Sequence, residues 1–123
     1  MATSLDIARV AAVAADSKKA TDLVLIDLIG TTDVCDYFLI CNGANNRQVD
    51  AIVDEIREKV FQNCGVRPTS CEGREASHWV LVDYGSVVVH VFDPETRDFY
   101  RLEKLWADAP RIDLNLEAEG SEE

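Results

Sequence analysis

The sequence predicts one α/β (α+β) domain, in which a mixed β-sheet of about five strands is flanked by helices. A chain of 123 residues has room for one domain but not for two. Segments with helical periodicity alternate with short runs rich in β-branched residues. Two such runs, residues 80–83 and 87–92, are joined by a short turn containing Gly85, which predicts an antiparallel hairpin. The expected element order is α-β-β-α-β-β-β-α.

The first helix is expected over residues 4 to about 20, because an apolar stripe of mainly alanine follows a plausible cap at residues 3–6. Residues 23–29 are almost continuously apolar, which is typical of a strand buried on both faces. Asp27 interrupts this run. We expect its carboxylate to be satisfied by donors of the following loop, residues 30–33, in a structural role.

Residues 34–41 predict a second strand. Asn45 then resembles a helix cap, with Gln48 placed to reach back as in a capping box. The helix that follows is expected to end at Gly65. Its buried face is predicted from helical spacing to comprise Val49, Ile52, Val53, Ile56 and Val60.

Residues 66–71 predict a short strand at a sheet edge, because Pro68 cannot donate a ladder hydrogen bond. After the hairpin, Asp93 and Pro94 predict the start of a short helix running to about Phe99. A further helical turn is expected over residues 101–106. The domain is assigned to residues 1–109, and residues 110–123 to an acidic tail that we expect to be disordered, above all at 115–123.

The net charge of −11 bears directly on the kind of partner. The tail contributes −4, so the domain itself carries −7. Binding to bare nucleic acid requires clustered Lys and Arg, and no such cluster is visible in the sequence, so direct nucleic-acid binding is not expected. An acidic protein of this size is better suited to a protein partner with a basic surface.

Neither a long apolar run nor a signal peptide is present, so we expect a cytoplasmic protein without membrane contact. The four cysteines, at positions 35, 41, 64 and 71, form no C-x-x-C pair. We therefore predict free thiols, with no metal site and no cofactor.

An enzymatic function is the main alternative. Asp27, Asp33 or Asp36 could hold magnesium in a small nucleotidyltransferase-like enzyme, although Asp33 and Asp36 would lie on opposite faces if both were in a strand. No glycine-rich phosphate loop is present. His90 alternates with valines along its strand and is more typical of a structural histidine than of a general base.

A binding surface is the stronger hypothesis. Trp79 and Tyr84 stand near the two ends of one arm of the hairpin, and both residue types are favoured anchors at interfaces. The alternative is that both rings cap the core beneath a helix. A third hypothesis is a homodimer in which the hairpin packs against its twin.

Several blocks of the sequence, in unbroken order over about residues 5–106, resemble the ribosomal silencing factor (Iojap) family. They are DYFLIC at 36–41, RQ at 47–48, EG at 72–73, WVLVDYG at 79–85, VVVHVF at 87–92 and LEKLW at 102–106. The resemblance implies a mixed-sheet fold similar to the nucleotidyltransferase fold, without established catalysis. It also implies a function: binding to ribosomal protein uL14 of the large subunit, which blocks joining of the small subunit and represses translation when nutrients are short.

The resemblance places the partner-binding surface around the hairpin, at Trp79, Tyr84, Gly85, Ser86 and Val88. Ser86 stands where the family usually has Asp. This difference removes a carboxylate that could pair with a basic residue of the partner. We therefore expect the apolar part of the contact to be kept more closely than its polar part.

Overall fold

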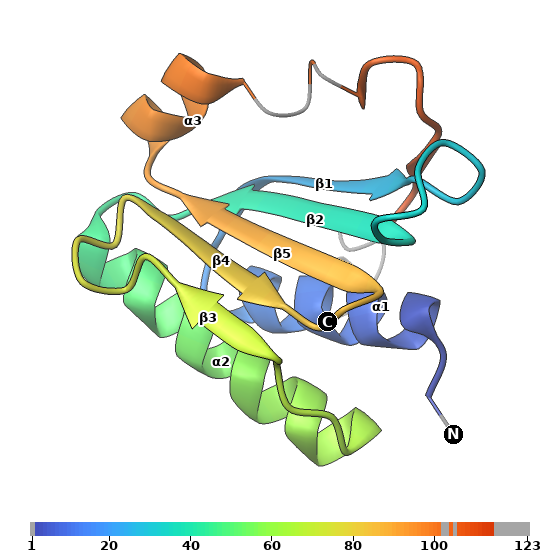
Figure 1. Ribbon diagram of the computed structural model, residues 1–123. Coiled ribbons are helices and arrows are strands. Elements are labelled where there is room, and N and C mark those ends of the chain that lie inside the picture. Colours follow the sequence, from blue (N-terminus) through green and yellow to red (C-terminus); the bar gives the residue numbers. More distant parts are fainter. Residues whose placement is uncertain (1, 102–103, 105, 115–123) are drawn as a thin grey trace.

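The computed structural model describes residues 2–101, 104 and 106–114, which fold into a sheet with helices on both sides (Figure 1). Its elements, in chain order, are α1 (Ser4–Ser17), β1 (Thr21–Asp27), β2 (Tyr37–Asn42), α2 (Asn46–Cys64), β3 (Ser70–Glu72), β4 (Trp79–Asp83), β5 (Val87–Phe92), α3 (Pro94–Tyr100) and β6 (Arg111–Ile112). The predicted α-β-β-α-β-β-β-α order is confirmed, with one further strand at the end.

The sheet is mixed, as predicted, and its strand order is β3-β4-β5-β2-β1-β6. Strands β2 and β5 are paired in parallel at its centre, whereas the other neighbouring strands are antiparallel. The hairpin of β4 and β5 and the edge position of β3 both agree with the sequence prediction. β3 is shorter than expected and begins beyond Pro68, at Ser70.

Strand β6 lies in the segment that the sequence analysis assigned to the tail. Its residues Arg111 and Ile112 pair with Ile26 and Leu25 of β1, and the carbonyl of Pro110 accepts a hydrogen bond of 2.8 Å from the Asp27 N–H. Two residues are too short for a sequence pattern to reveal, and the strand forms because β1 would otherwise present an unpaired edge. The sheet therefore includes two residues beyond 109. The predicted disorder at 115–123 lies outside the described residues, as does part of the turn expected at 101–106.

Both long helices begin at the predicted caps, and α2 also ends where predicted, but α1 ends at Ser17 and not near residue 20. The Thr3 side chain and Asp6 form a reciprocal capping box at the start of α1. Asn45 accepts a hydrogen bond of 2.9 Å from the Gln48 N–H, and α2 ends at Gly65. The Gln48 side chain differs from the prediction, because its oxygen accepts from the N–H of Ala44 instead of that of the cap residue.

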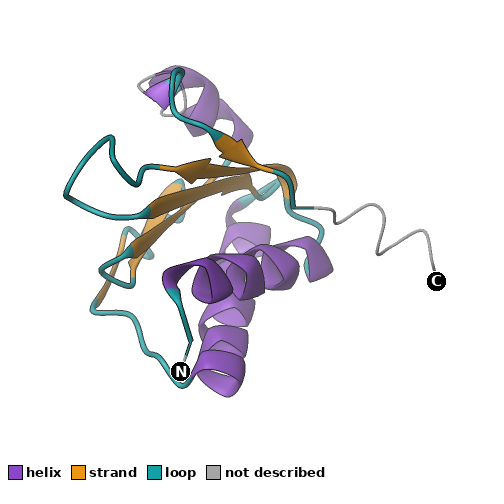
Figure 2. Cartoon of the chain, turned by 90° about the vertical axis from the view of Figure 1, so that its right-hand side faces the viewer, coloured by secondary structure: helices purple, strands orange, loops and turns teal. Residues whose placement is uncertain are grey.

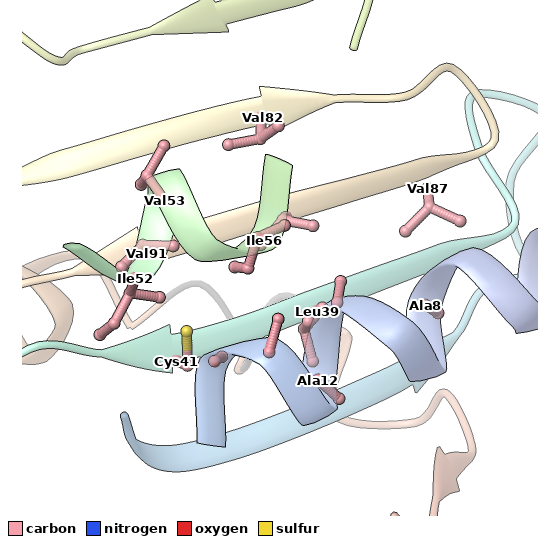
Figure 3. Packing of buried hydrophobic residues seen from close by; sticks show 14 of the residues in the cluster. Ala8, Ala12, Leu39, Cys41, Ile52, Val53, Ile56, Val82, Val87 and Val91 are labelled. Atoms are coloured by element: carbon pink, nitrogen blue, oxygen red, sulfur yellow. The ribbon is translucent and has the colours of Figure 1, made fainter. Parts of the chain in front are cut away.

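Helices α1 and α2 cover one face of the sheet, and α3 lies on the opposite side (Figure 2). The main core fills the space between the two long helices and the sheet. Figure 3 shows Ala8 and Ala12 of α1, Ile52 and Ile56 of α2, and Leu39 of β2 meeting there, all of them at most 1% exposed. Small side chains on α1 let that helix lie close to the strands, while the larger side chains of α2 fill its wider gap.

The first two strands lie a few residues away from their predicted positions. β1 starts at Thr21 instead of residue 23, and β2 starts at Tyr37 instead of residue 34. Residues 28–36 form a loop, so Asp33 and Asp36 precede β2 and lie outside any strand. Among the described residues, no helix is both long enough and apolar enough to cross a membrane.

Candidate docking face

Side chains of the hairpin divide between the two faces of the sheet. Because successive strand residues point to opposite sides, Val80 and Val82 of β4 enter the main core, whereas Trp79 and Leu81 face away from α1 and α2. Tyr84 lies five residues after Trp79, an odd number. The two rings that the sequence singled out are therefore on opposite faces.

The side of the sheet away from the long helices carries a set of rings that we call the aromatic face. Its members are Phe38, Trp79, His90, Phe92, Phe99, Tyr100 and Trp106. They come from β2, β4, β5, α3 and the chain just before β6, so residues far apart in sequence meet on one surface.

Ring contacts connect the whole aromatic face. The Tyr100 ring centroid lies 4.8 Å from that of Trp79 and 5.0 Å from that of Phe99. Trp79 also stacks on Phe92 at 5.0 Å. Further along, the ring of Phe38 lies 4.7 Å from that of His90 and 6.0 Å from that of Trp106. Such contacts hold the rings in a fixed arrangement, which lowers the entropy lost when a partner binds.

The aromatic face is open to solvent at the α3 end. Phe99 is 78% exposed and Tyr100 is 53% exposed, while Trp79 and Phe38 are half-buried. Large aromatic side chains that stay this exposed beside a packed row of rings form the kind of apolar patch that marks a docking surface. Trp79 therefore contributes both to packing and to the exposed surface.

Trp79 is oriented by a hydrogen bond from its indole Nε1–H to Nδ1 of His90, at 3.1 Å. Nδ1 must then be an acceptor, so His90 is neutral and carries its proton on Nε2. Burial lowers the pKa of His90 to about 4, with a smaller opposing effect from Asp83. His90 thus plays the structural role that its position among valines predicted.

Tyr84 belongs to the main core. Its side chain is only 7% exposed, and burial raises its pKa to about 12. Its hydroxyl finds no hydrogen-bond partner within the described part of the chain. The Tyr84 ring therefore packs into the core, as one of the two hypotheses predicted, whereas the Trp79 ring remains partly accessible.

The hairpin turn sits at the far end of the same strands. Gly85 is exposed and has a φ of 86°, and Ser86 is half-buried. The Ser86 carbonyl accepts hydrogen bonds from the N–H groups of Asp36 and Tyr37, at 2.7 and 3.1 Å. The turn is thereby fixed to the start of β2. Val88, on the side of the aromatic face, is 8% exposed and presents little surface.

The three carboxylates of the enzymatic alternative do not share one site. Asp27 accepts a hydrogen bond of 2.9 Å from the Ile29 N–H, close to the loop that was expected to supply its donors. Asp36 accepts a hydrogen bond of 3.0 Å from the Ser4 hydroxyl, and Asp33 is exposed in the loop. Within residues 2–101, 104 and 106–114, no three His, Cys, Asp or Glu side chains are grouped so as to hold a metal ion.

Sequence reasoning missed most of the aromatic face. It selected Trp79 but not Phe38, Phe99, Tyr100 or Trp106, which join it only through sheet pairing and the return of the chain over the sheet. One signal was available: Phe99 and Tyr100 are adjacent at the end of a helix of seven residues, too short to bury both. An aromatic pair in that position predicts exposed apolar surface.

Known proteins are similar to this chain over most of its length. A family model described as "Ribosomal silencing factor during starvation" matches residues 1–123. The ribosomal silencing factor RsfS of Bacillus subtilis is 48% identical over 110 residues, covering 89% of this chain and 92% of that protein. The mouse protein named "Mitochondrial assembly of ribosomal large subunit protein 1" is 36% identical over 92 residues, which are 72% of this chain and 40% of the mouse protein.

A solved structure supports the same assignment. The crystal structure of a protein from Chromobacterium violaceum superimposes with a TM-score of 0.82 at 35% identity, covering 86% of this chain and 88% of that one. Fold and sequence therefore agree: this chain belongs to the ribosomal silencing factor family.

Proposed function

We propose that this protein represses translation under nutrient limitation by binding ribosomal protein uL14 on the large subunit. Bound there, it would exclude the small subunit by its volume alone. Membership of the silencing-factor family supports a role at the ribosome, and the name of the mouse relative refers to the large subunit. The proposed site of action is the cytoplasm, where ribosomal subunits meet.

The single observation that carries the proposal is the aromatic face. Its rings combine a fixed arrangement with exposure at one end, and Trp and Tyr are the residue types most enriched among residues that dominate binding energy. We assign the central contact to Trp79 and Tyr100, with Gly85 and Ser86 at the other end of the hairpin, where Val88, only 8% exposed, would support the surface from beneath. Tyr84 would act indirectly, by supporting the turn from within the core.

The negative net charge of the chain supports a partner with a basic surface. The chain carries a net charge of −11, and proteins that bind ribosomal RNA present basic surfaces. Complementary charge accelerates encounter and disfavours wrong partners, while the buried rings supply most of the affinity. Steric exclusion requires no catalysis, so the proposal involves no enzymatic step and no cofactor.

A homodimer could compete with this contact. Two copies that packed their aromatic faces together would bury the surface proposed for uL14. We therefore propose that any such dimer must dissociate before ribosome binding. Sedimentation velocity across a concentration series, with and without uL14, would detect the exchange.

The proposal is tested by cosedimentation with purified large subunits, followed by addition of small subunits. We expect the protein to remain with the large subunit and to reduce joining. Trp79→Ala should weaken binding by about 30-fold or more, because loss of a central anchor costs about 2 kcal/mol. Since Trp79 also packs, Tyr100→Ala serves as a second variant with little effect on the core. Phe61→Ala is the matched control, because Phe61 is 44% exposed on α2, on the other side of the sheet.

Two results would contradict the proposal. A wild-type protein that stays in the supernatant at low salt would remove the ribosomal role. Folded Trp79→Ala and Tyr100→Ala variants that bind as tightly as Phe61→Ala would move the interface away from the aromatic face.

A further inference from the structure

Helix α3 also borders a groove. A groove of about 730 Å³ lies between α3, the start of β1 and strand β6. Four of the twelve Lys and Arg residues of the chain line this groove: Arg97, Arg101, Lys104 and Arg111. In a protein with a net charge of −11, this concentration of positive charge is a distinct local feature.

Among the lining residues that the structure describes, basic side chains outnumber carboxylates. Asp98 lies 3.5 Å from Arg101 in an ion pair, and the Asp22 carboxylate accepts a hydrogen bond of 3.2 Å from the Asn42 amide. In the part of the chain that the structure describes, Lys104 and Arg111 form no ion pair, and both side chains are exposed. Among the described residues that line the groove, four cations face two carboxylates.

Arg97 makes the groove a built site. Its side chain is only 7% exposed, and Nη1 donates to the Asp22 carbonyl and, at 3.0 Å, to the Asn42 side-chain oxygen. These contacts connect α3 to β1 and β2. A guanidinium held in this way is a fixed positive charge with reduced screening by water, and Lys104 and Arg111 add exposed cations at the rim.

We infer that this groove binds phosphate groups of the ribosomal RNA next to the docking site. The inference rests on the proposed function, because α3 and its C-cap would carry both contacts: Phe99 and Tyr100 toward the protein partner, and Arg97 and the C-cap Arg101 toward the groove. The surface of a large subunit is rich in RNA phosphate. An acidic protein bound there needs local positive charge where it faces the RNA backbone. Arg and Lys side chains supply that charge and can bind the phosphates.

This proposal departs from the expectation of no nucleic-acid contact. That expectation depended on finding no basic cluster in the sequence. The cluster is formed by folding: the C-cap Arg101 lies one turn after Arg97, with its N–H bonded to the Arg97 carbonyl, and β6 brings Arg111 to the same groove.

The test is the salt dependence of binding to purified large subunits. We expect the double variant Lys104→Ala/Arg111→Ala to bind about tenfold more weakly at low salt. The slope of log Kd against log salt concentration should fall by about 1 to 2, because each lost phosphate contact removes roughly one released counterion. The matched control Arg57→Ala/Lys59→Ala makes the same charge change on α2 and should keep the wild-type slope. Tyr100→Ala should weaken binding without changing the slope.

Binding to isolated uL14 distinguishes the proposed docking function from the proposed RNA contact of the groove. The groove variant should bind uL14 like the wild-type protein if its role is contact with RNA. Failure of the wild-type protein to bind either uL14 or large subunits would overturn the proposed function. An unchanged slope and affinity for subunits in the groove variant would overturn the groove proposal alone.

A direct titration tests the groove even if ribosome binding fails. Amide NMR shifts of Arg97, Lys104 and Arg111 are followed on adding a short RNA duplex or inorganic tripolyphosphate. Shifts with RNA support the proposal, and no shift with either probe overturns it. Saturation by tripolyphosphate with no response to RNA would replace RNA by a free nucleotide polyphosphate as the ligand.

Discussion

Protonation of His90 is expected to destabilise the fold as the pH falls. The imidazole is 4% exposed, between the rings of Trp79 and Phe38. Burial lowers its pKa from 6.5 to about 4, because the charged ring would lose its hydration, and Asp83 offsets only part of this effect. The hydrogen bond from Trp79 to Nδ1 also requires the neutral ring.

The sign and size of the effect follow from proton linkage. The unfolded chain binds a proton at His90 near pH 6.5, whereas the folded protein binds it only near pH 4, so the unfolded state holds more protons between these values. This contribution to the free energy of unfolding is complete above pH 6.5 and is lost as the pH falls toward 4. It amounts to about 3 kcal/mol in total, of which about 2 kcal/mol is lost by about pH 5.

Urea unfolding near neutral pH and at about pH 5 measures this loss. The wild-type protein should lose about 2 kcal/mol more than His90→Gln over that interval, because every other titrating group is common to both proteins. His90→Asn provides a second, shorter replacement with a hydrogen-bond acceptor.

Equal losses in wild type and variant would refute the reasoning. So would an NMR titration in which the His90 imidazole of the folded protein titrates near its ordinary pKa. Either result would mean that water or a polar group hydrates the ring within the aromatic face.

Two further predictions concern the backbone and the thiols. Gly73→Ala should destabilise the fold by more than 2 kcal/mol, measured by urea unfolding, because the new Cβ would lie 2.2 Å from the Trp79 carbonyl at a φ of 92°. Gly85→Ala has a similar φ of 86° but open space around it, and should cost only about 1 kcal/mol; equal effects would show that the close approach to Trp79 is not maintained. Cys41 should resist alkylation in the folded protein at mildly alkaline pH while Cys71 reacts, as mass spectrometry can show, because complete burial raises the pKa of Cys41 to about 12. Comparable modification rates without denaturant would contradict that burial.

The parts of the fold that depend on local signals could be predicted. The cap at Asn45, the end of α2 at Gly65 and the hairpin around Gly85 each follow from a few neighbouring residues. The bounds of β1 and β2 shifted by two or three residues, because apolar composition alone does not say which residues of a run pair with a neighbouring strand. Strand β6 was missed because only the edge of β1 makes its two residues a strand.

The sequence by itself determined the fold class, the acidic charge and the family. These follow from periodicity, counting and motif order, none of which requires a partner distant in the chain. Tertiary structure decided which rings share a surface. It placed Tyr84 in the core and Trp79 beside Tyr100 on the aromatic face, and it gathered Arg97 and Arg111 around one groove. Such groupings arise from strand order and from the way α3 packs, and both depend on contacts between residues far apart in the sequence.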